Sequence, residues 1–143
     1  MAITKPSGYA MECMHFEGGS PHDDVIPTAV VQLIGPDGTS IRDTSTGSNI
    51  VEAVCNALNR TIGVDFVLKG IDSITVGDLI PFQVVLCVAS NGGNVEIGIA
   101  RSKDPVVAIA KAYLNAVNAL LRDRPLSPED AFKLERFGVR GED

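Results

Sequence analysis

The sequence has few of the residues from which active sites and metal centres are usually built. Its 143 residues include only two histidines, His15 and His22, and three cysteines, Cys13, Cys55 and Cys87. Neither histidine belongs to a metal-ligand spacing such as H-x-x-x-H, and no C-x-x-C pair is present. This scarcity limits acid–base and metal chemistry, and we expect neither a metal nor a cofactor.

Long hydrophobic runs, an export signal and an excess of positive charge are also lacking. No apolar stretch approaches the roughly 20 residues that cross a bilayer, and residues 1–6 contain no hydrophobic region of a signal peptide. The cysteines form an odd set without paired spacing, which is typical of a reducing compartment. The net charge of -6 would repel a phosphate backbone. We therefore expect a cytoplasmic protein with no membrane span and no nucleic-acid partner.

The chain does have enough apolar residues for one folded domain. With 45% hydrophobic residues it can bury a core, although it is too short for two ordinary domains. Residues 1–24 show no periodicity and contain several prolines and glycines, so we predict an N-terminal arm there.

The middle of the chain predicts two sets of strands, each followed by a helix. In the first set we expect strands at residues 25–34 and 39–44, joined by a turn at residues 36–38. The helix that follows should begin after Asn49, with Glu52 completing a capping box, and end at Gly63. Apolar residues that recur at helical spacing and share one face support this helix: Ile50, Val54, Ala57, Leu58 and Ile62.

The second set begins with a long strand at residues 65–76, where Gly70 predicts a bulge. The continuous apolar run at 82–89 is typical of a central strand, and Asn91-Gly92-Gly93 predicts a hairpin turn to a strand at 94–100. Asp104 and Pro105 should begin a helix whose many alanines let it approach a sheet closely. A short helix is predicted at residues 127–137.

The two sets resemble one unit used twice. A shift of 55 positions places Gly38 on Gly93, Asn49 on Asp104, and Val51 on Val106. We therefore predict a duplicated domain at residues 25–122, with repeats at about 25–63 and 65–122, followed by a tail at 123–143.

The remaining chemistry is sparse. Met11, Cys13, Met14 and His15 include soft ligands that could attract copper or zinc, but we interpret them as part of a solvated or docked tail. Cys55 lies mid-helix and Cys87 mid-strand, and we interpret both as buried structural thiols.

A pair of matching strand-to-helix loops, residues 46–53 and 97–105, is the strongest functional feature. Each presents backbone N–H groups at a helix N-terminus, an environment that favours a carboxylate or another anion. The same glycines and polar residues would also be needed merely to shape tight turns and cap helices, so both interpretations remain open.

At these loops the sequence resembles the C-terminal regulatory domain of the 2-isopropylmalate synthase and citramalate synthase family. The family's Gly-x-Gly-Pro-Val-Asp-Ala signature corresponds to Gly-Ser-Asn-Ile-Val-Glu-Ala at residues 47–53. Its second signature corresponds to Gly98, Ser-Lys-Asp at 102–104, and Ala-Tyr-Leu-Asn-Ala-Val-Asn at 112–118. The resemblance covers about residues 25–122.

The resemblance implies an α+β fold: a duplicated βββα module with two mostly antiparallel sheets, helices packed on them, and a homodimer. It also implies that leucine or isoleucine binds at the dimer interface and regulates a separate catalytic barrel. Carried over by position, the residues implied to line the ligand site are Gly47, Asn49, Val51, Glu52, Ala100, Arg101 and Ser102.

The sequence also departs from the family pattern. Asn49 and Ile50 replace a glycine and a proline, and residues 68–72 lack the Asp-Tyr pair that the family often has there. The catalytic barrel is absent, so we do not expect an enzyme. Two hypotheses remain: an allosteric module for a branched-chain amino acid that acts on a catalytic partner, or a structural subunit that lost the ligand and assembles through its terminal extensions. The initial Met1 and the added ends favour a free-standing protein.

Overall fold

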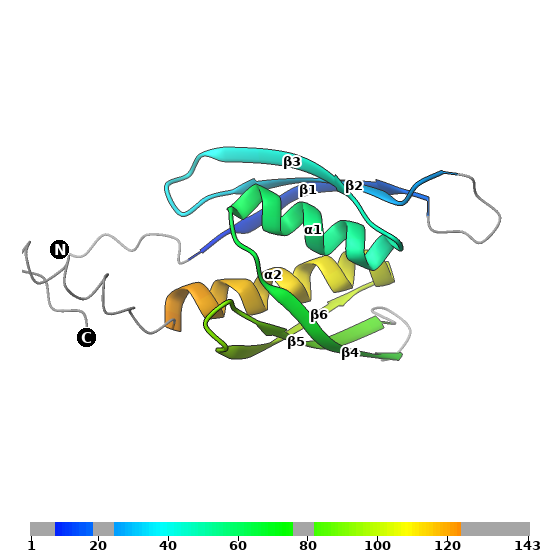
Figure 1. Ribbon diagram of the computed structural model, residues 1–143. Helices are drawn as coiled ribbons and strands as arrows, with labels where there is room; N and C mark the ends of the chain where they lie inside the picture. Colours follow the sequence, from blue (N-terminus) through cyan, green and yellow to red (C-terminus); the bar gives the residue numbers. More distant parts are fainter. Residues whose placement is uncertain (1–7, 19–24, 76–81, 124–143) are drawn as a thin grey trace, which may run out of the picture.

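A computed structural model describes residues 8–18, 25–75 and 82–123, which form two three-stranded antiparallel sheets and two helices (Figure 1). The first sheet has the order β1-β2-β3 and the second the order β4-β5-β6. The elements are β1 (Ala10–Glu17), β2 (Thr28–Ile34), β3 (Ser40–Thr46), α1 (Ile50–Ile62), β4 (Val67–Thr75), β5 (Phe82–Ala89), β6 (Val95–Ser102) and α2 (Pro105–Asp123). The predicted α+β fold, a duplicated βββα module, is confirmed.

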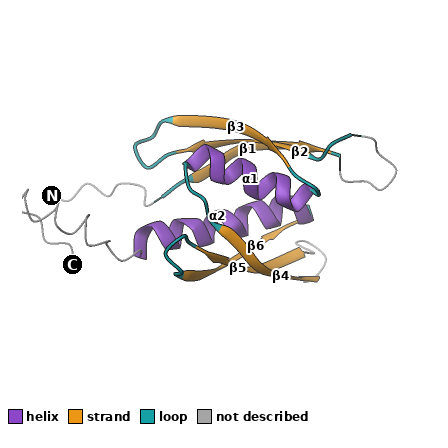
Figure 2. Ribbon diagram, viewed as in Figure 1, coloured by secondary structure: helices purple, strands orange, loops and turns teal. Residues whose placement is uncertain are grey.

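The helices form a middle layer between the two sheets (Figure 2). Helix α1 packs on β2 and β3, α2 packs on β5 and β6, and the two helices contact each other. Each helix follows the third strand of its own sheet, so both begin at the same end of the molecule (Figure 1). The two strand-to-helix loops singled out in the sequence therefore lie at that shared end.

The prediction of an N-terminal arm over residues 1–24 is wrong for residues 10–17. These residues form β1, an edge strand paired antiparallel with β2, and the first repeat begins there instead of at residue 25. An irregularity in the pairing between Met11 and Cys13 explains the error, because the extra residue breaks the alternation that marks a strand. Met14 and Phe16 nevertheless pack against the core.

The predicted turns and bulge are confirmed. Gly38 and Gly93 have φ values of 86° and 88°, the left-handed conformation that favours glycine, and each occupies a hairpin turn. The pairing of β4 with β5 is irregular between Leu68 and Gly70. The predicted bulge therefore lies between Leu68 and Gly70, where β4 changes register against the central strand β5.

The predicted helix ends are confirmed as well. The Asn49 side chain accepts a hydrogen bond from the Glu52 N–H group, and Gly63 ends α1 with φ 87°. At the start of α2, Oδ1 of Asp104 accepts from the Val106 and Val107 N–H groups at 2.8 and 3.4 Å. These bonds satisfy amides that a helix leaves unpaired in its first turn.

The core lies between the sheets and around the helices. Its largest fully buried side chains include Tyr113, Leu33, Leu58 and Leu86, and burial of each such side chain contributes about 1.5–3 kcal/mol. The alanines of α2 allow the close approach that the sequence predicts: a Cβ atom at Gly98 would collide with the backbone of Ala112.

The outer faces of the two sheets differ in chemistry. On β6, Val95, Ile97 and Ile99 are 54%, 60% and 53% exposed, whereas the corresponding face of β3 carries Ser40, Arg42, Thr44 and Thr46. Cys87 of β5 pairs with Ile97, so it belongs to this outer face and is half-buried. The prediction that Cys87 is a buried core thiol is therefore wrong, because successive residues of a strand face opposite sides.

The helix predicted at residues 127–137 lies outside the described residues, and so does His22. Within the described part of the chain, neither helix has the length and hydropathy needed to cross a membrane.

Candidate functional site

The loop before α1 brings the chain unusually close to the first turn of that helix. The Gly47 N–H group donates to the Pro27 carbonyl oxygen at 3.1 Å. A Cβ atom at Gly47 would lie 2.6 Å from the backbone nitrogen of Ala53, a distance that no side chain could occupy without moving the helix start. Gly47 is therefore required by the fold.

Asn49 and Glu52 cap α1 through two side-chain hydrogen bonds. Oδ1 of Asn49 accepts from the Glu52 N–H group at 2.9 Å, and Oε1 of Glu52 accepts from the Ser48 N–H group at 2.8 Å. The return bond thus reaches Ser48 instead of Asn49, one residue earlier than in the predicted capping box. Among the described residues, the N–H groups of Ile50 and Val51 have no hydrogen-bond acceptor.

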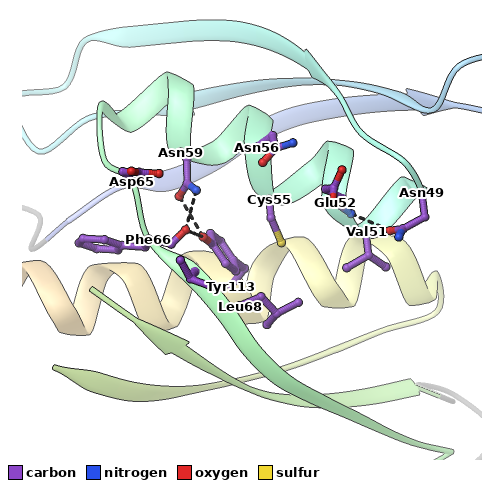
Figure 3. Close-up of a pocket in the computed structure, with 11 residues that line it drawn as sticks. Asn49, Val51, Glu52, Cys55, Asn56, Asn59, Asp65, Phe66, Leu68 and Tyr113 are labelled. Atoms are coloured by element: carbon purple, nitrogen blue, oxygen red, sulfur yellow. Dashed lines mark hydrogen bonds between the residues drawn. The ribbon is translucent and has the colours of Figure 1, made fainter. Parts of the chain in front are cut away.

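A half-open cavity of about 410 Å³ extends from this helix start along α1. Figure 3 shows its walls: one face of α1, the chain that enters β4, and Tyr113 of α2. The lining residues are Asn49, Val51, Glu52, Cys55, Asn56, Asn59, Asp65, Phe66, Val67, Leu68 and Tyr113. The cavity has the size of a small-molecule site.

The lining of the cavity combines apolar and polar groups. Val51, Phe66, Leu68 and the Tyr113 ring supply apolar contact, whereas three asparagines and two carboxylates supply polar contact. The α1 N-terminus adds the partial positive charge of its free N–H groups. Such a lining suits a small molecule that has a charged or polar head and an aliphatic side chain.

Tyr113, Asn59 and Phe66 form a hydrogen-bonded network at the back of the cavity. The Tyr113 hydroxyl lies 2.9 Å from Oδ1 of Asn59 and 3.1 Å from the Phe66 carbonyl oxygen, and can donate its proton to either. Nδ2 of Asn59 donates to the same Phe66 carbonyl at 2.9 Å. Figure 3 shows these bonds joining α1, α2 and the segment before β4.

Burial perturbs the two ionisable groups nearest this network. It raises the pKa of the Cys55 thiol to about 12, with a smaller contribution from the negative charge of Glu52. Burial also raises the pKa of Tyr113, while its hydrogen bond with Asn59 acts in the opposite direction. Both groups are therefore neutral near pH 7, and the Cys55 thiol is a poor nucleophile.

The structure places only part of the sequence-derived site at the cavity. Asn49, Val51 and Glu52 line it, and Gly47 lies just before them without lining it. On the other loop, Nε of Arg101 donates to Oε1 of Gln83 at 2.7 Å on the outer face of the second sheet.

The other two site residues predicted on the second loop, Ala100 and Ser102, make local contacts. Ala100 packs against the core, and Oγ of Ser102 accepts from the Asp104 N–H group at 3.2 Å. Ala100, Arg101 and Ser102 are therefore not brought to the cavity lining within one copy of the chain, although they lie at the same end of the molecule.

Sequence reasoning missed the remaining lining residues. Cys55 and Asn59 follow Val51 at four-residue intervals, so helical spacing could have placed them on the same face. Phe66, Leu68 and Tyr113 reach the cavity only through tertiary packing, which no local pattern indicates.

The soft side chains near the N-terminus do not converge. Met11 and Met14 pack against the core, whereas Cys13 and His15 are exposed on the other face of β1. Within the described residues, no group of three His, Cys, Asp or Glu side chains is arranged to hold a metal ion.

The chain matches the model of the LeuA allosteric (dimerisation) domain family over residues 4–121. It is 35% identical over 120 residues to a 2-isopropylmalate synthase of Pelotomaculum thermopropionicum, and 36% identical over 120 residues to one of Carboxydothermus hydrogenoformans. Each match covers 82% of this chain and 23% of the relative. A 2-isopropylmalate synthase of Gloeobacter violaceus is 36% identical over 117 residues, covering 80% of this chain and 21% of that protein. The chain thus spans less than a quarter of the length of these relatives.

Proposed function

Because the chain belongs to the LeuA allosteric (dimerisation) domain family, we propose that it is a non-catalytic regulatory domain that binds a branched-chain amino acid in the cavity beside α1. The binding would occur in a homodimer and would act on a catalytic partner. The observation that carries the proposal is the cavity itself, because it joins the free N–H groups of a helix start to an apolar wall.

The two ends of the amino acid have different partners in this lining. The unpaired N–H groups of Ile50 and Val51 can donate to the α-carboxylate, and the helix N-terminus favours that charge. The aliphatic side chain can contact Val51 and Leu68, which are half-buried and would lose exposed apolar area on binding.

The homodimer would account for the residues that one copy leaves outside the cavity. Ala100, Arg101 and Ser102 lie at the end of the molecule where α1 begins, but on the other sheet. In the proposal, these residues reach the ligand from a second copy. The proposed compartment is the cytoplasm, where a biosynthetic effector would be available.

Calorimetry with leucine, isoleucine and valine on a matched pair of variants tests the proposal. Val51→Asp places a carboxylate in the cavity and should abolish binding through charge repulsion. Val106→Asp makes the same change at the matching second position of α2 and should leave binding unchanged. Because aspartate is favourable in the first turn of a helix, both variants should fold. Absence of heat with all three amino acids on the unmodified protein, or normal binding by Val51→Asp, would refute the proposal.

A structural subunit is the second candidate function, since the outer face of the second sheet exposes Val95, Ile97 and Ile99. An apolar patch of this kind is typical of surfaces that contact other proteins. In this alternative the dimerising fold persists without a ligand, and the chain joins a larger complex through its terminal extensions.

Truncation at the C-terminal end tests the alternative more cleanly than truncation at the N-terminal end. Removing residues 1–24 would delete β1 and disrupt the first sheet, whereas removing residues 124–143 leaves every described element in place. The alternative predicts that the shorter chain forms a smaller assembly, with fewer subunits by light scattering of the purified protein. An unchanged number of subunits would contradict assembly through that extension.

A further inference from the structure

We propose that Tyr113 is a positioning residue of the cavity: its hydroxyl, through Asn59, holds the Phe66 carbonyl and so fixes the wall that enters β4. This inference rests on the proposed function for its ligand readout, and on the contacts of two side chains and one backbone carbonyl for its geometry. It makes the shape of a site beside the helix of the first repeat depend on the helix of the second repeat.

Two asparagine contacts in the molecule show what the tyrosine contributes. The side chain of Asn118 in α2 makes two bonds to the backbone of Tyr9, the residue before β1: it accepts from the Tyr9 N–H group and donates to the Tyr9 carbonyl, both at 2.8 Å. Asn59 in α1 donates to the carbonyl of Phe66, the residue before β4. Each helix therefore fastens the segment that begins a repeat.

The two contacts differ at the asparagine oxygen. Oδ1 of Asn118 accepts from the backbone of the segment that it fastens, whereas Oδ1 of Asn59 lies 2.9 Å from the Tyr113 hydroxyl. At the cavity, the Tyr113 hydroxyl of α2 therefore takes the place that a backbone N–H group has at Asn118. Since Asn59 donates only one bond to the segment before β4, its orientation depends on Tyr113.

The position of Phe66 matters because its neighbours form the cavity wall. Asp65, Val67 and Leu68 line the cavity together with Phe66. The Tyr113 side chain is fully buried, and loss of its hydroxyl would leave the half-buried Asn59 side chain without that donor at Oδ1. We expect the asparagine to reorient and the segment at residues 64–68 to move away from α1.

Cys55 offers a measurement of this movement that needs no ligand. Its thiol is buried and lines the cavity, while Cys13 is exposed and lies in the first sheet. Opening of the wall should expose Cys55 to a thiol reagent without changing Cys13. Mass spectrometry of the labelled full chain reports both rates in the same sample.

The experiment compares Tyr113→Phe with Asn118→Ala in the 143-residue chain. Tyr113→Phe keeps the ring and removes only the hydroxyl, whereas Asn118→Ala removes two bonds between residues that do not line the cavity. In Tyr113→Phe, we expect the thiol reagent to label Cys55 about tenfold faster than in the unmodified chain. We also expect leucine to bind about tenfold more weakly, a change of the size of one lost hydrogen bond. Asn118→Ala should lower the Tm while leaving both quantities unchanged.

The outcomes separate this inference from the proposed function. Unchanged Cys55 labelling in Tyr113→Phe would overturn the inference, as would equal acceleration in Asn118→Ala, because that would indicate a general loss of stability. If the unmodified chain binds neither leucine, isoleucine nor valine, the proposed function fails, but the labelling rates still decide the role of Tyr113.

Discussion

Gly98 of β6 lies against the backbone of Ala112 in α2, so closely that a Cβ atom on the glycine would overlap the alanine carbonyl oxygen. This contact sets the distance between the second sheet and the helix that carries Tyr113. The close approach therefore depends on the absence of a side chain at Gly98.

Gly98→Ala should destabilise the protein by about 3 kcal/mol, since the added methyl group must displace backbone atoms. Gly70→Ala is the control, because a Cβ atom there would meet nothing within 4 Å. Urea denaturation followed by circular dichroism measures both. Equal unfolding midpoints for the two variants would show that α2 does not pack on Gly98 as described.

Substitutions on the two faces of the second sheet should change the free energy of unfolding by very different amounts. Leu86 is 2% exposed and faces the helices, so Leu86→Ala should cost about 2–5 kcal/mol. Ile97 is 60% exposed on the outer face, and Ile97→Lys should change the free energy of unfolding by less than about 0.5 kcal/mol. Thermal unfolding of both variants at low protein concentration provides the comparison, and a large loss with Ile97→Lys would argue that this face is covered.

The two helix caps should contribute similar stability but differ in their effect on ligand binding. Asn49→Ala and Asp104→Ala each remove a side-chain acceptor for first-turn N–H groups, a loss of about 1 kcal/mol. Asn49 lines the cavity and Asp104 does not, so Asn49→Ala should weaken leucine binding more than Asp104→Ala does. Denaturation and calorimetry on the same samples test this, and equal binding by both variants would move the site away from α1.

Alkaline pH should unfold the protein partly through Cys55. Its pKa rises from the ordinary 9.0 to about 12 on folding, so the unfolded chain loses this proton first as the pH increases. The contribution of the thiol is therefore complete below about pH 9 and is lost as the pH rises toward the folded value. Burial of Tyr113 acts in the same direction. Unfolding midpoints between about pH 8 and pH 11 should fall less steeply in Cys55→Ala than in the unmodified protein; parallel curves would contradict the burial of this thiol.

The sequence was sufficient for those elements whose local chemistry agrees with the fold. Asn49, Gly63 and Asp104 occupy the helix ends at which their capping properties place them, and Gly38 and Gly93 adopt the positive φ of hairpin turns. Strand β1 escaped prediction because it lies at an edge and contains an irregularity after Met11. A broken alternation flanked by glycines looks like a loop until the partner strand is known.

The site was predictable only on one side. The family resemblance at the first loop implied the helix-start residues Asn49, Val51 and Glu52, and they do line the cavity. The opposite wall does not follow from any motif, because Phe66 and Tyr113 are separated by 47 positions and meet only when α2 packs beside α1. The second loop matched the first in sequence, yet its residues face the core and the outer surface.

Titration of the 15N-labelled chain with leucine, followed by amide chemical shifts, would locate the effector site residue by residue. We expect the largest shifts at the Ile50, Val51 and Glu52 amides and across residues 65–68, with shifts also at residues 100–102 of the second copy. The matching amides of Val106 and Val107 should remain nearly unchanged. Shifts confined to another surface, or the absence of any shift at millimolar leucine, would contradict the assignment of this cavity as the effector site.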